Sequence, residues 1–447
     1  MKKVITYGTF DLLHHGHIRL LQRAKDLGDY LIVGVTSDNF DRSRGKINVK
    51  QSLMERIEAV RSLGIADEII VEEYEGQKID DVQRYDIDIF TVGSDWIGKF
   101  DYLKEYCSVV YLERTEGVSS SEIRGENRKI KLGIVGDDEY LNKFYRESQY
   151  VNGLRVSAVY RESLVNIASE YAAVPCITDE YDVLLEKVEA VYIHSYPEKH
   201  YELIKRALNK GIHVLCESPI VLKISEFEEL QALARDNRCI LMDALRTAYS
   251  TAYSRLLLLL RSGIIGEVKS VDATCTSLKN YTEFKAGNLD KQWNTICAWG
   301  PNAMLPVFQI LGTDYKAKSI VSSLIDEKAG FDLFTKIDFI YPNAVASIKI
   351  GQGVKSEGHL VVSGTKGYVY VPAPWWKTDY FEVRFENIEE NKRYFYQLEG
   401  EGIRYELVAF CKAIESGIIS GYIERNVSKE FVKVINDFFD KKDFSLI

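Results

Sequence analysis

The chain has 447 residues and a formal net charge of -9 at neutral pH. This length is too great for one ordinary hydrophobic core and predicts two or three domains. The negative charge excludes proteins that bind nucleic acid through a broadly basic surface, although it allows a local basic pocket for one nucleotide. The 7 cysteines are scattered and form no CxxC pair, which excludes a disulfide framework or zinc site and indicates a reducing compartment. Apolar runs such as Leu256–Leu260 are far too short to span a bilayer, so we expect a cytoplasmic protein without membrane insertion.

Strand-like and helix-like segments alternate over the first 112 residues. A β-type run at 4–7 is followed by a turn at 8–11 and by apolar residues at helical spacing. Gly28 comes after this predicted helix, in the position expected of a C-cap glycine. The continuous apolar run at 30–36 is typical of a strand buried on both faces. Further strands are expected at 68–71, 89–92 and 109–112, with helices near 52–63 and 78–84. This alternation predicts an α/β fold with a parallel, doubly wound sheet.

The pattern is interrupted by a polar stretch at 124–129 and restarts at 130–135, which indicates a domain boundary. A second Rossmann-like α/β unit follows, with strands expected at 156–160, 190–194 and 213–216. After residue 246, longer β-rich segments predict an α+β domain with one large, mostly antiparallel sheet. These segments lie at 268–276, 334–340, 344–350, 359–363 and 368–371. We therefore expect three domains, at 1–128, 129–245 and 246–447.

Three of the 7 histidines, His14, His15 and His17, fall within four residues, directly after the first expected strand and its turn. A helix N-terminus offers unpaired backbone N–H groups and a partial positive charge, which together bind anions. Gly16 lets a phosphate approach the backbone, and imidazoles in the first turn can donate hydrogen bonds as a transition state gains charge. The pattern predicts a phosphate site. The alternatives are a solvated histidine run and a metal site, for which no cysteine or acidic cluster completes the ligand set.

The segment GTFDLLHHGH at 8–17 resembles the HxGH signature of the cytidylyltransferase-like nucleotidyltransferases. RTEGVSSS at 114–121 is similar to the RTEGISTT segment of the cytidylyltransferase branch, and GSDWIGKFD at 93–101 is similar to a segment of glycerol-3-phosphate cytidylyltransferases. The resemblance covers residues 1–125 nearly without gaps. It implies that the acceptor phosphate of a small polyol, such as glycerol 3-phosphate, attacks the α-phosphorus of CTP in line. Pyrophosphate leaves, and Mg²⁺ screens the triphosphate.

The resemblance also implies a role for each matching position. The residues expected to be catalytic are His14, His17, Lys46 and Arg114. Contacts to the nucleotide are expected from Thr9, Phe10, Gly16, Asp95, Thr115, Gly117, Ser119 and Ser120. Contacts to the acceptor are expected from Asp11, Asp38, Arg44, Arg56 and Lys78, and no protein ligand is assigned to the metal.

Structural explanations stay open for three of these positions. Asp38 is a possible helix N-cap, Lys78 a solvated helix lysine and Asp95 a residue that shapes a loop. Two departures from the family pattern, Gly64 in place of an arginine and Arg44 in place of a lysine, leave the identity of the acceptor open.

From about residue 129 onward the chain resembles the Gfo/Idh/MocA oxidoreductases, in segments such as VEAVYI at 188–193 and HVLCESP at 213–219. The dinucleotide fingerprint of this family needs glycines beside the pyrophosphate. Here GIVGDDE at 133–139 keeps only Gly136 of these and places three carboxylates near the expected phosphates. Other family positions differ as well: Tyr160 replaces the ribose-binding acid, Ser218 the lysine, and Ala298 and Asn302 an aspartate and a histidine.

Two hypotheses follow for this region. The first is a catalytically degenerate oxidoreductase fold that supports dimerisation, binds a product or positions a partner. The second is an active NAD(P)-dependent reductase that makes the acceptor for the first domain. For the whole protein we expect CTP and a small polyol phosphate as ligands, a homodimer, and a role in wall or capsule polymer synthesis. An adenylyltransferase acting on a sugar phosphate or flavin precursor is the alternative for the first domain.

Overall fold

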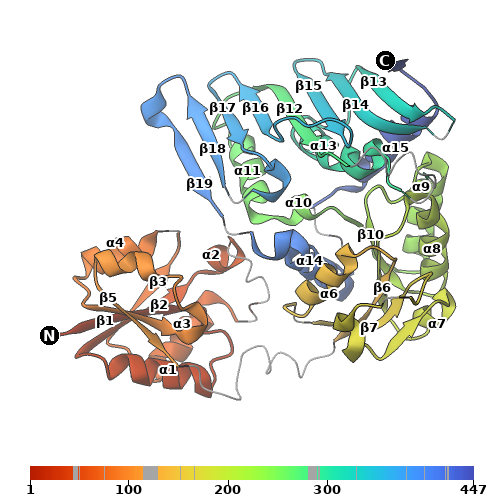
Figure 1. The fold of residues 1–447 in the computed structure, drawn as a ribbon. Coiled ribbons are helices and arrows are strands. Elements are labelled where there is room, and N and C mark those ends of the chain that lie inside the picture. The colour runs from red at the N-terminus through yellow and green to blue at the C-terminus, as the bar shows by residue number, and fades with distance from the viewer. Residues whose placement is uncertain are drawn as a thin grey trace. The chain divides into compact units, whose positions relative to one another are not determined.

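The computed structural model describes residues 1–447 except 44–48, 50, 75, 114–128, 152, 166, 280–288, 290–291, 329, 379, 397, 418 and 420–421. The chain forms two compact units, residues 1–129 and 130–447 (Figure 1). The further division expected at residue 246 stays a prediction. No helix that the structure describes is both long and apolar enough to cross a membrane.

The first unit is built around a parallel five-stranded sheet with the strand order β3-β2-β1-β4-β5. Val4 of β1 lies between Leu31 of β2 and Ile89 of β4. The chain therefore builds the sheet first to one side of β1 and then to the other. In doubly wound sheets, ligands bind beyond the carboxyl ends of the strands at such a reversal. The strands are β1 Lys3–Gly8, β2 Tyr30–Thr36, β3 Glu68–Glu72, β4 Ile89–Gly93 and β5 Ser108–Leu112.

Successive strand residues point to opposite faces of this sheet and so build two cores. Val4 belongs to the core under α1 and α3, whereas Ile5 belongs to the core under α4. Figure 1 shows α4 on one side of the sheet and α1 on the other. The helices are α1 His15–Lys25, α2 Asp38–Ser43, α3 Leu53–Ser62 and α4 Gln77–Arg84, with 3-10 turns η1 Ser94–Trp96 and η2 Asp101–Glu105.

Gly28 does not cap the first helix, contrary to the sequence prediction. Helix α1 ends at Lys25, and Asp26 is its C-cap. A Cβ atom added to Gly28 would lie 2.6 Å from the carbonyl oxygen of Lys2. The glycine is therefore required by the close approach of the turn to the start of β1, and not by the helix end.

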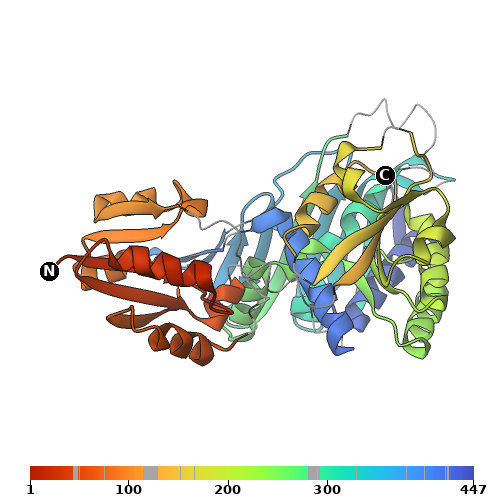
Figure 2. The ribbon, with the colours of Figure 1, turned by 90° about the horizontal axis from the view of Figure 1, so that it is seen from below.

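The second unit contains a parallel six-stranded sheet with the order β11-β10-β9-β6-β7-β8, which reverses between β6 and β9. Helices α7, α8 and α9 bury apolar side chains on one face, and α8 and α9 run alongside each other (Figure 2). On α6, the ring of Phe144 stacks on Tyr192 of β9 at 3.7 Å between centroids. The strands are β6 Ile130–Val135, β7 Leu154–Tyr160, β8 Cys176–Thr178, β9 Ala190–Ile193, β10 His213–Glu217 and β11 Leu241–Ala244. The helices are α6 Tyr140–Ser148, α7 Tyr181–Leu185, α8 Pro197–Asn209 and α9 Ile224–Asp236, with 3-10 turn η3 Ser169–Ala173.

A nine-stranded sheet completes the second unit, with the order β19-β18-β17-β16-β12-β15-β14-β13-β20. Its neighbours pair antiparallel except for β12 with β15 and β13 with β20, which confirms the large, mostly antiparallel sheet. Helices α11, α13 and α15 lie along one face (Figure 1). The strands are β12 Val268–Thr276, β13 Ala317–Asp326, β14 Phe331–Ile340, β15 Val345–Gly351, β16 Leu360–Gly364, β17 Gly367–Val371, β18 Tyr380–Phe385, β19 Lys392–Phe395 and β20 Phe444–Leu446. The helices are α10 Arg246–Tyr249, α11 Thr251–Arg261, α13 Thr295–Leu311, α14 Ile403–Ser416 and α15 Arg425–Phe439, with 3-10 turns η5 Trp375–Lys377, η6 Ile388–Glu390 and η7 Glu399–Gly402.

The short strand β20 lies along β13 at one side of the nine-stranded sheet, with Ile320 opposite Phe444. Lys318 of β13 is almost fully buried there, and its Nζ contacts Asp437 at 2.6 Å and Asp443 at 2.8 Å. This buried ammonium group therefore ties both α15 and the segment before β20 to β13.

Candidate active site

The loop after β1 has a conformation that its own sequence disfavours. Phe10 and Leu12 have φ values of 52° and 48°, in the left-handed region where residues other than glycine are uncommon. Contacts with the segment before α3 fix the loop: Leu12 N donates to Gln51 Oε1 at 2.7 Å, and Gln51 N donates to Asp11 Oδ1 at 3.0 Å. The buried ring of Phe10 packs edge-on against His17 at 5.5 Å. Because tertiary contacts hold this strained loop, it is shaped before any ligand arrives.

His14 is the N-cap of α1. Its Nδ1 accepts a hydrogen bond from Gly16 N at 3.1 Å, and its ring stacks on His17 with 3.9 Å between centroids. Since Nδ1 accepts, the neutral ring carries its proton on Nε2, and this Nε2–H group can donate a hydrogen bond. The first turn of α1 contains no acidic residue, so no side chain there opposes an anion. His15 is exposed. The structure thus brings together His14, Gly16 and His17 from the predicted set.

Arg56 connects the ends of β1 and β2. Its guanidinium is fully buried and donates to the carbonyl oxygens of Thr9 at 2.7 Å and Thr36 at 2.8 Å, and to Asp38 Oδ1 at 2.5 Å. The Thr9 hydroxyl in turn donates to Asp41 Oδ1 at 2.8 Å, and Asp41 Oδ2 lies 3.6 Å from Arg56 Nη1. This geometry gives Arg56 a supporting position behind the loop that contains Thr9.

Asp38 is not the N-cap of its helix. The side chain of Ser37 accepts from Phe40 N at 3.2 Å and its carbonyl accepts from Asp41 N at 2.8 Å, so Ser37 occupies the capping position. Asp38 is the first residue of α2, and its carboxylate also accepts from Leu53 N at 3.3 Å. The N-cap explanation of Asp38 is therefore wrong, and its carboxylate connects α2, α3 and Arg56.

Lys78 is buried on α4, so the explanation as a solvated helix lysine is wrong. Its ammonium group pairs with Glu72 at the end of β3 and lies 4.6 Å from the centre of the Tyr7 ring. Glu72 also accepts a hydrogen bond from Thr36 Oγ1 at 2.8 Å. Tyr7 donates to Asp81 at 2.8 Å, and burial, followed by the charge of Asp81, raises the pKa of this phenol. The result is a buried polar cluster beside the carboxyl ends of three neighbouring strands.

Asp95 lies in η1, directly after β4, and is exposed. The strand order reverses between β1 and β4. The histidine loop follows β1, and Asp95 follows β4. The remaining predicted site residues lie outside the described residues, namely Arg44, Lys46, Arg114, Thr115, Gly117, Ser119 and Ser120. Among the residues that are described, no group of three histidine, cysteine or acidic side chains is placed to hold a metal ion.

Sequence reasoning missed Gln51, Asp41 and Glu72. A capping box marks the start of α3, in which Ser52 and Glu55 bond each other's backbone N–H groups. That signal locates Gln51 directly before the helix and beside the loop. Glu72 ends a strand of a parallel sheet, where ligand sites gather. Asp41 carried no comparable signal, because its partners Thr9 and Arg56 are distant in sequence.

In the second unit, Ser218 stands at the position where the family pattern has a lysine. Its hydroxyl donates to Asp243 Oδ1 at 2.9 Å, and Ser428 donates to Asp243 Oδ2 at 2.5 Å. Burial raises the pKa of Asp243 to about 6, although both hydroxyl groups act to lower it. At another altered position, Asn302 Oδ1 accepts a hydrogen bond from Thr247 Oγ1 at 3.1 Å. Both replacement side chains are thus engaged in hydrogen bonds within the protein.

A parallel sheet with a strand-order reversal and a histidine-capped helix N-terminus beyond β1 defines the first unit as a nucleotidyltransferase of the HxGH class. Residues 5–126 match the family described as cytidylyltransferase-like. The first unit is 52% identical over 124 residues to glycerol-3-phosphate cytidylyltransferase of Bacillus spizizenii, and 48% identical over 126 residues to that of Staphylococcus aureus. Each alignment covers 28% of this chain and 95% of the relative. The chain therefore belongs to the cytidylyltransferase-like family.

The second unit matches a different family. Residues 130–244 match the Gfo/Idh/MocA oxidoreductase family with its NAD-binding Rossmann fold. Among solved structures, a 3-ketoreductase from Actinomadura kijaniata in complex with NADP and TDP-benzene has a TM-score of 0.64 at 17% identity. The match covers 72% of this chain and 100% of that chain. At this identity the likeness shows the fold of the second unit.

Proposed function

We propose that the first unit transfers CMP from CTP to a small polyol phosphate, either glycerol 3-phosphate or a close relative, and releases pyrophosphate. The observation that carries this proposal is the N-terminus of α1, where His14 and His17 stack beside Gly16 at the carboxyl edge of β1. The identity of the first unit to two glycerol-3-phosphate cytidylyltransferases supports both CTP and the polyol phosphate. The product, a CDP-polyol, would serve wall or capsule polymer synthesis.

The helix N-terminus would bind the triphosphate. Backbone N–H groups in the first turn of α1 and the positive end of the helix attract the phosphate oxygens. The Nε2 proton of His14 and the ring of His17 stabilise the negative charge that builds up as the bond to pyrophosphate breaks. The acceptor phosphate is already an anion, so the reaction needs alignment and charge neutralisation rather than a strong base. Mg²⁺ is proposed to accompany the triphosphate, since phosphate oxygens are its preferred ligands.

Other side chains contribute by position. Arg56 is proposed as a positioning residue that fixes the Thr9 carbonyl and Asp38, because its guanidinium is fully buried behind the loop. Lys78 is held by Glu72 at the same edge of the sheet and is proposed to add positive charge near the acceptor. The family match supports further phosphate contacts from Lys46, Arg44, Arg114 and the segment at 115–120, and a contact from Asp95 to the cytosine.

The decisive experiment measures pyrophosphate release by the full chain with CTP or ATP, Mg²⁺ and a panel of polyol phosphates. We expect release with CTP and at least one polyol phosphate. His15→Ala is the matched control for His14→Ala, because His15 lies in the same cluster but is exposed. Absence of release with CTP and every acceptor contradicts the proposal. A clear preference for ATP would favour the adenylyltransferase alternative.

A further inference from the structure

The second unit has the topology of a dinucleotide site, with its strand order reversed between β6 and β9. In this fold the pyrophosphate lies on the N-terminus of the helix that follows the first strand, which here is α6. Gly136, between β6 and α6, has φ 141°, and an added Cβ would lie 2.0 Å from the carbonyl oxygen of His194. The approach of β9 therefore requires this glycine whether or not a dinucleotide binds.

A carboxylate of the protein lies where the pyrophosphate would bind. Asp138 Oδ1 accepts a hydrogen bond at 2.7 Å from Tyr140 N, at the start of α6. The N–H groups at a helix N-terminus are those that a pyrophosphate uses in this fold. The other oxygen of Asp138 lies 3.7 Å from His194 Nε2. One side chain thus occupies the anion position of α6 and is itself paired with a cation.

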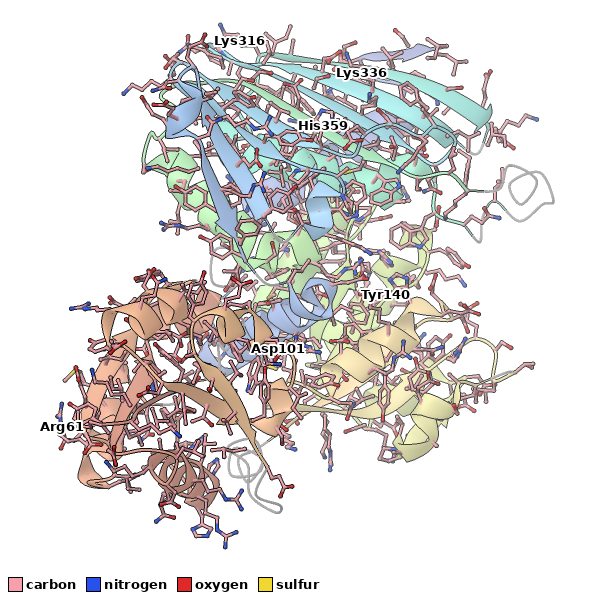
Figure 3. All side chains as sticks on the ribbon, turned by 60° about the vertical axis from the view of Figure 1, so that its left-hand side comes forward. Arg61, Asp101, Tyr140, Lys316, Lys336 and His359 are labelled. Atoms are coloured by element: carbon pink, nitrogen blue, oxygen red, sulfur yellow. The ribbon has the colours of Figure 1, made fainter. Side chains whose placement is uncertain are left out.

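His194 extends this arrangement across the order reversal. It follows β9 directly, and its Nδ1 lies 3.6 Å from Glu217 Oε1 at the end of β10. Burial acts to lower the pKa of His194, but the nearby carboxylates of Asp138 and Glu217 outweigh it and raise the pKa to about 9. The ring of Tyr140, labelled in Figure 3, lies 5.0 Å from the ring of His194. A charged imidazole between two carboxylates therefore connects the ends of β6, β9 and β10.

The loop after β6 also forms hydrogen bonds with the end of β7, the place where a dinucleotide-binding unit binds the adenosine ribose. Arg161 Nη2 donates to the carbonyl oxygen of Asp137 at 2.7 Å. The Asp137 carboxylate accepts from Glu162 N and Ser163 N, each at 3.3 Å. The arginine that would suit a 2′-phosphate is therefore bonded to the loop itself. The sequence predicted three carboxylates facing the phosphates. All three side chains are exposed, but Asp137 and Asp138 each accept hydrogen bonds from backbone N–H groups of the protein.

We infer that the second unit binds neither NAD(H) nor NADP(H), because Asp138 occupies the pyrophosphate position and Asp137 with Arg161 closes the ribose position. This inference concerns a unit that the proposed cytidylyl transfer does not use. It favours a structural or partner-binding task for the oxidoreductase fold over a reductase that makes the acceptor.

Fluorescence titration of the full chain with NADH and with NADPH tests the inference directly. We expect no saturable binding to the wild type up to about 1 mM, a concentration that corresponds to roughly 4 kcal/mol of binding free energy. The variant Asp137→Ala/Asp138→Ala is expected to bind NADPH at least tenfold more tightly than the wild type, because it frees the N-terminus of α6 and removes the carboxylate that lies 3.6 Å from Arg161 Nε. Glu139→Ala is the control: it removes one negative charge from the same loop but no hydrogen bond, and is expected to bind no better than the wild type.

Saturable micromolar binding of either dinucleotide to the wild type would overturn the inference. So would a double variant that folds, as judged by circular dichroism, but binds no better than Glu139→Ala. If the double variant does not fold, Asp138→Ala alone takes its place, because that side chain is about half exposed and its removal frees the N-terminus of α6. The single variant is expected to bind NADPH at least tenfold more tightly than Glu139→Ala does, and equal binding by these two variants would overturn the pyrophosphate part of the inference.

Discussion

Replacing His14 by asparagine and by alanine separates the two tasks that this side chain performs at the start of α1. Its Nδ1 caps the helix by accepting from Gly16 N, and its Nε2 proton is proposed to bind phosphate. Asparagine is a strong N-cap, whereas loss of a cap to alanine costs about 1 kcal/mol. We therefore expect His14→Ala to destabilise the first unit by this amount and His14→Asn to leave its stability unchanged.

Turnover is expected to respond differently from stability. Loss of one donor to a developing negative charge lowers turnover by roughly 10²- to 10³-fold, or about 3 to 4 kcal/mol. Both His14 variants should show this loss, because the shorter asparagine side chain does not carry a donor to the position of Nε2. Pyrophosphate release under saturating CTP measures turnover, calorimetry measures stability, and His15→Ala serves as the control. Wild-type turnover in His14→Asn would refute the catalytic assignment and leave His14 as a helix cap alone.

Three further predictions concern buried charges. Arg56→Met removes four hydrogen bonds and is expected to destabilise the first unit by roughly 3 to 5 kcal/mol, measured as a lower calorimetric unfolding midpoint. An unchanged midpoint would contradict the supporting position of Arg56 behind the Thr9 loop. Lys78→Met leaves Glu72 buried without its cation, so adding Glu72→Gln should recover most of the lost stability. A double variant no more stable than Lys78→Met would argue against the buried ion pair of Lys78 with Glu72. The pKa of His194 is raised from 6.5 to about 9, so its contribution of about 3 kcal/mol is complete below pH 6.5 and is lost as the pH rises through 9. His194→Gln should flatten this decline in a calorimetric pH series, and an identical pH profile would contradict the assignment.

The histidine site could be predicted from sequence because its members are close neighbours. The alternation of apolar segments predicted the parallel sheet, and the HxGH pattern placed His14, Gly16 and His17 at one helix start. Local patterns were less informative where distant segments meet. Gly28 matched a helix C-cap, yet its role depends on the carbonyl of Lys2, which no helical pattern indicates.

Charged residues were the least predictable part of the site. Lysine and arginine are almost always exposed, so their residue type argues against burial. Arg56 and Lys78 are nevertheless buried, because Asp38, Asp41 and Glu72 neutralise them from other strands and helices. Asp138 is a further case of a charge whose partner is distant in sequence. The sequence predicted that it would face a phosphate, whereas in the fold it pairs with His194, more than fifty positions further along the chain.

The strand β20 has a consequence for the behaviour of the protein at high concentration. Without it, the middle of the ten-residue strand β13, at residues 320–322, would present unpaired N–H and C=O groups at one side of the nine-stranded sheet. Such a border invites pairing with another polypeptide and is a common origin of aggregation. Three residues, held by the ion pairs of Lys318 to Asp437 and Asp443, occupy that border from within the same chain. Loss of this small strand would therefore affect solubility more than fold, and it makes residues 444–446 a poor choice for deletion or for a fusion junction.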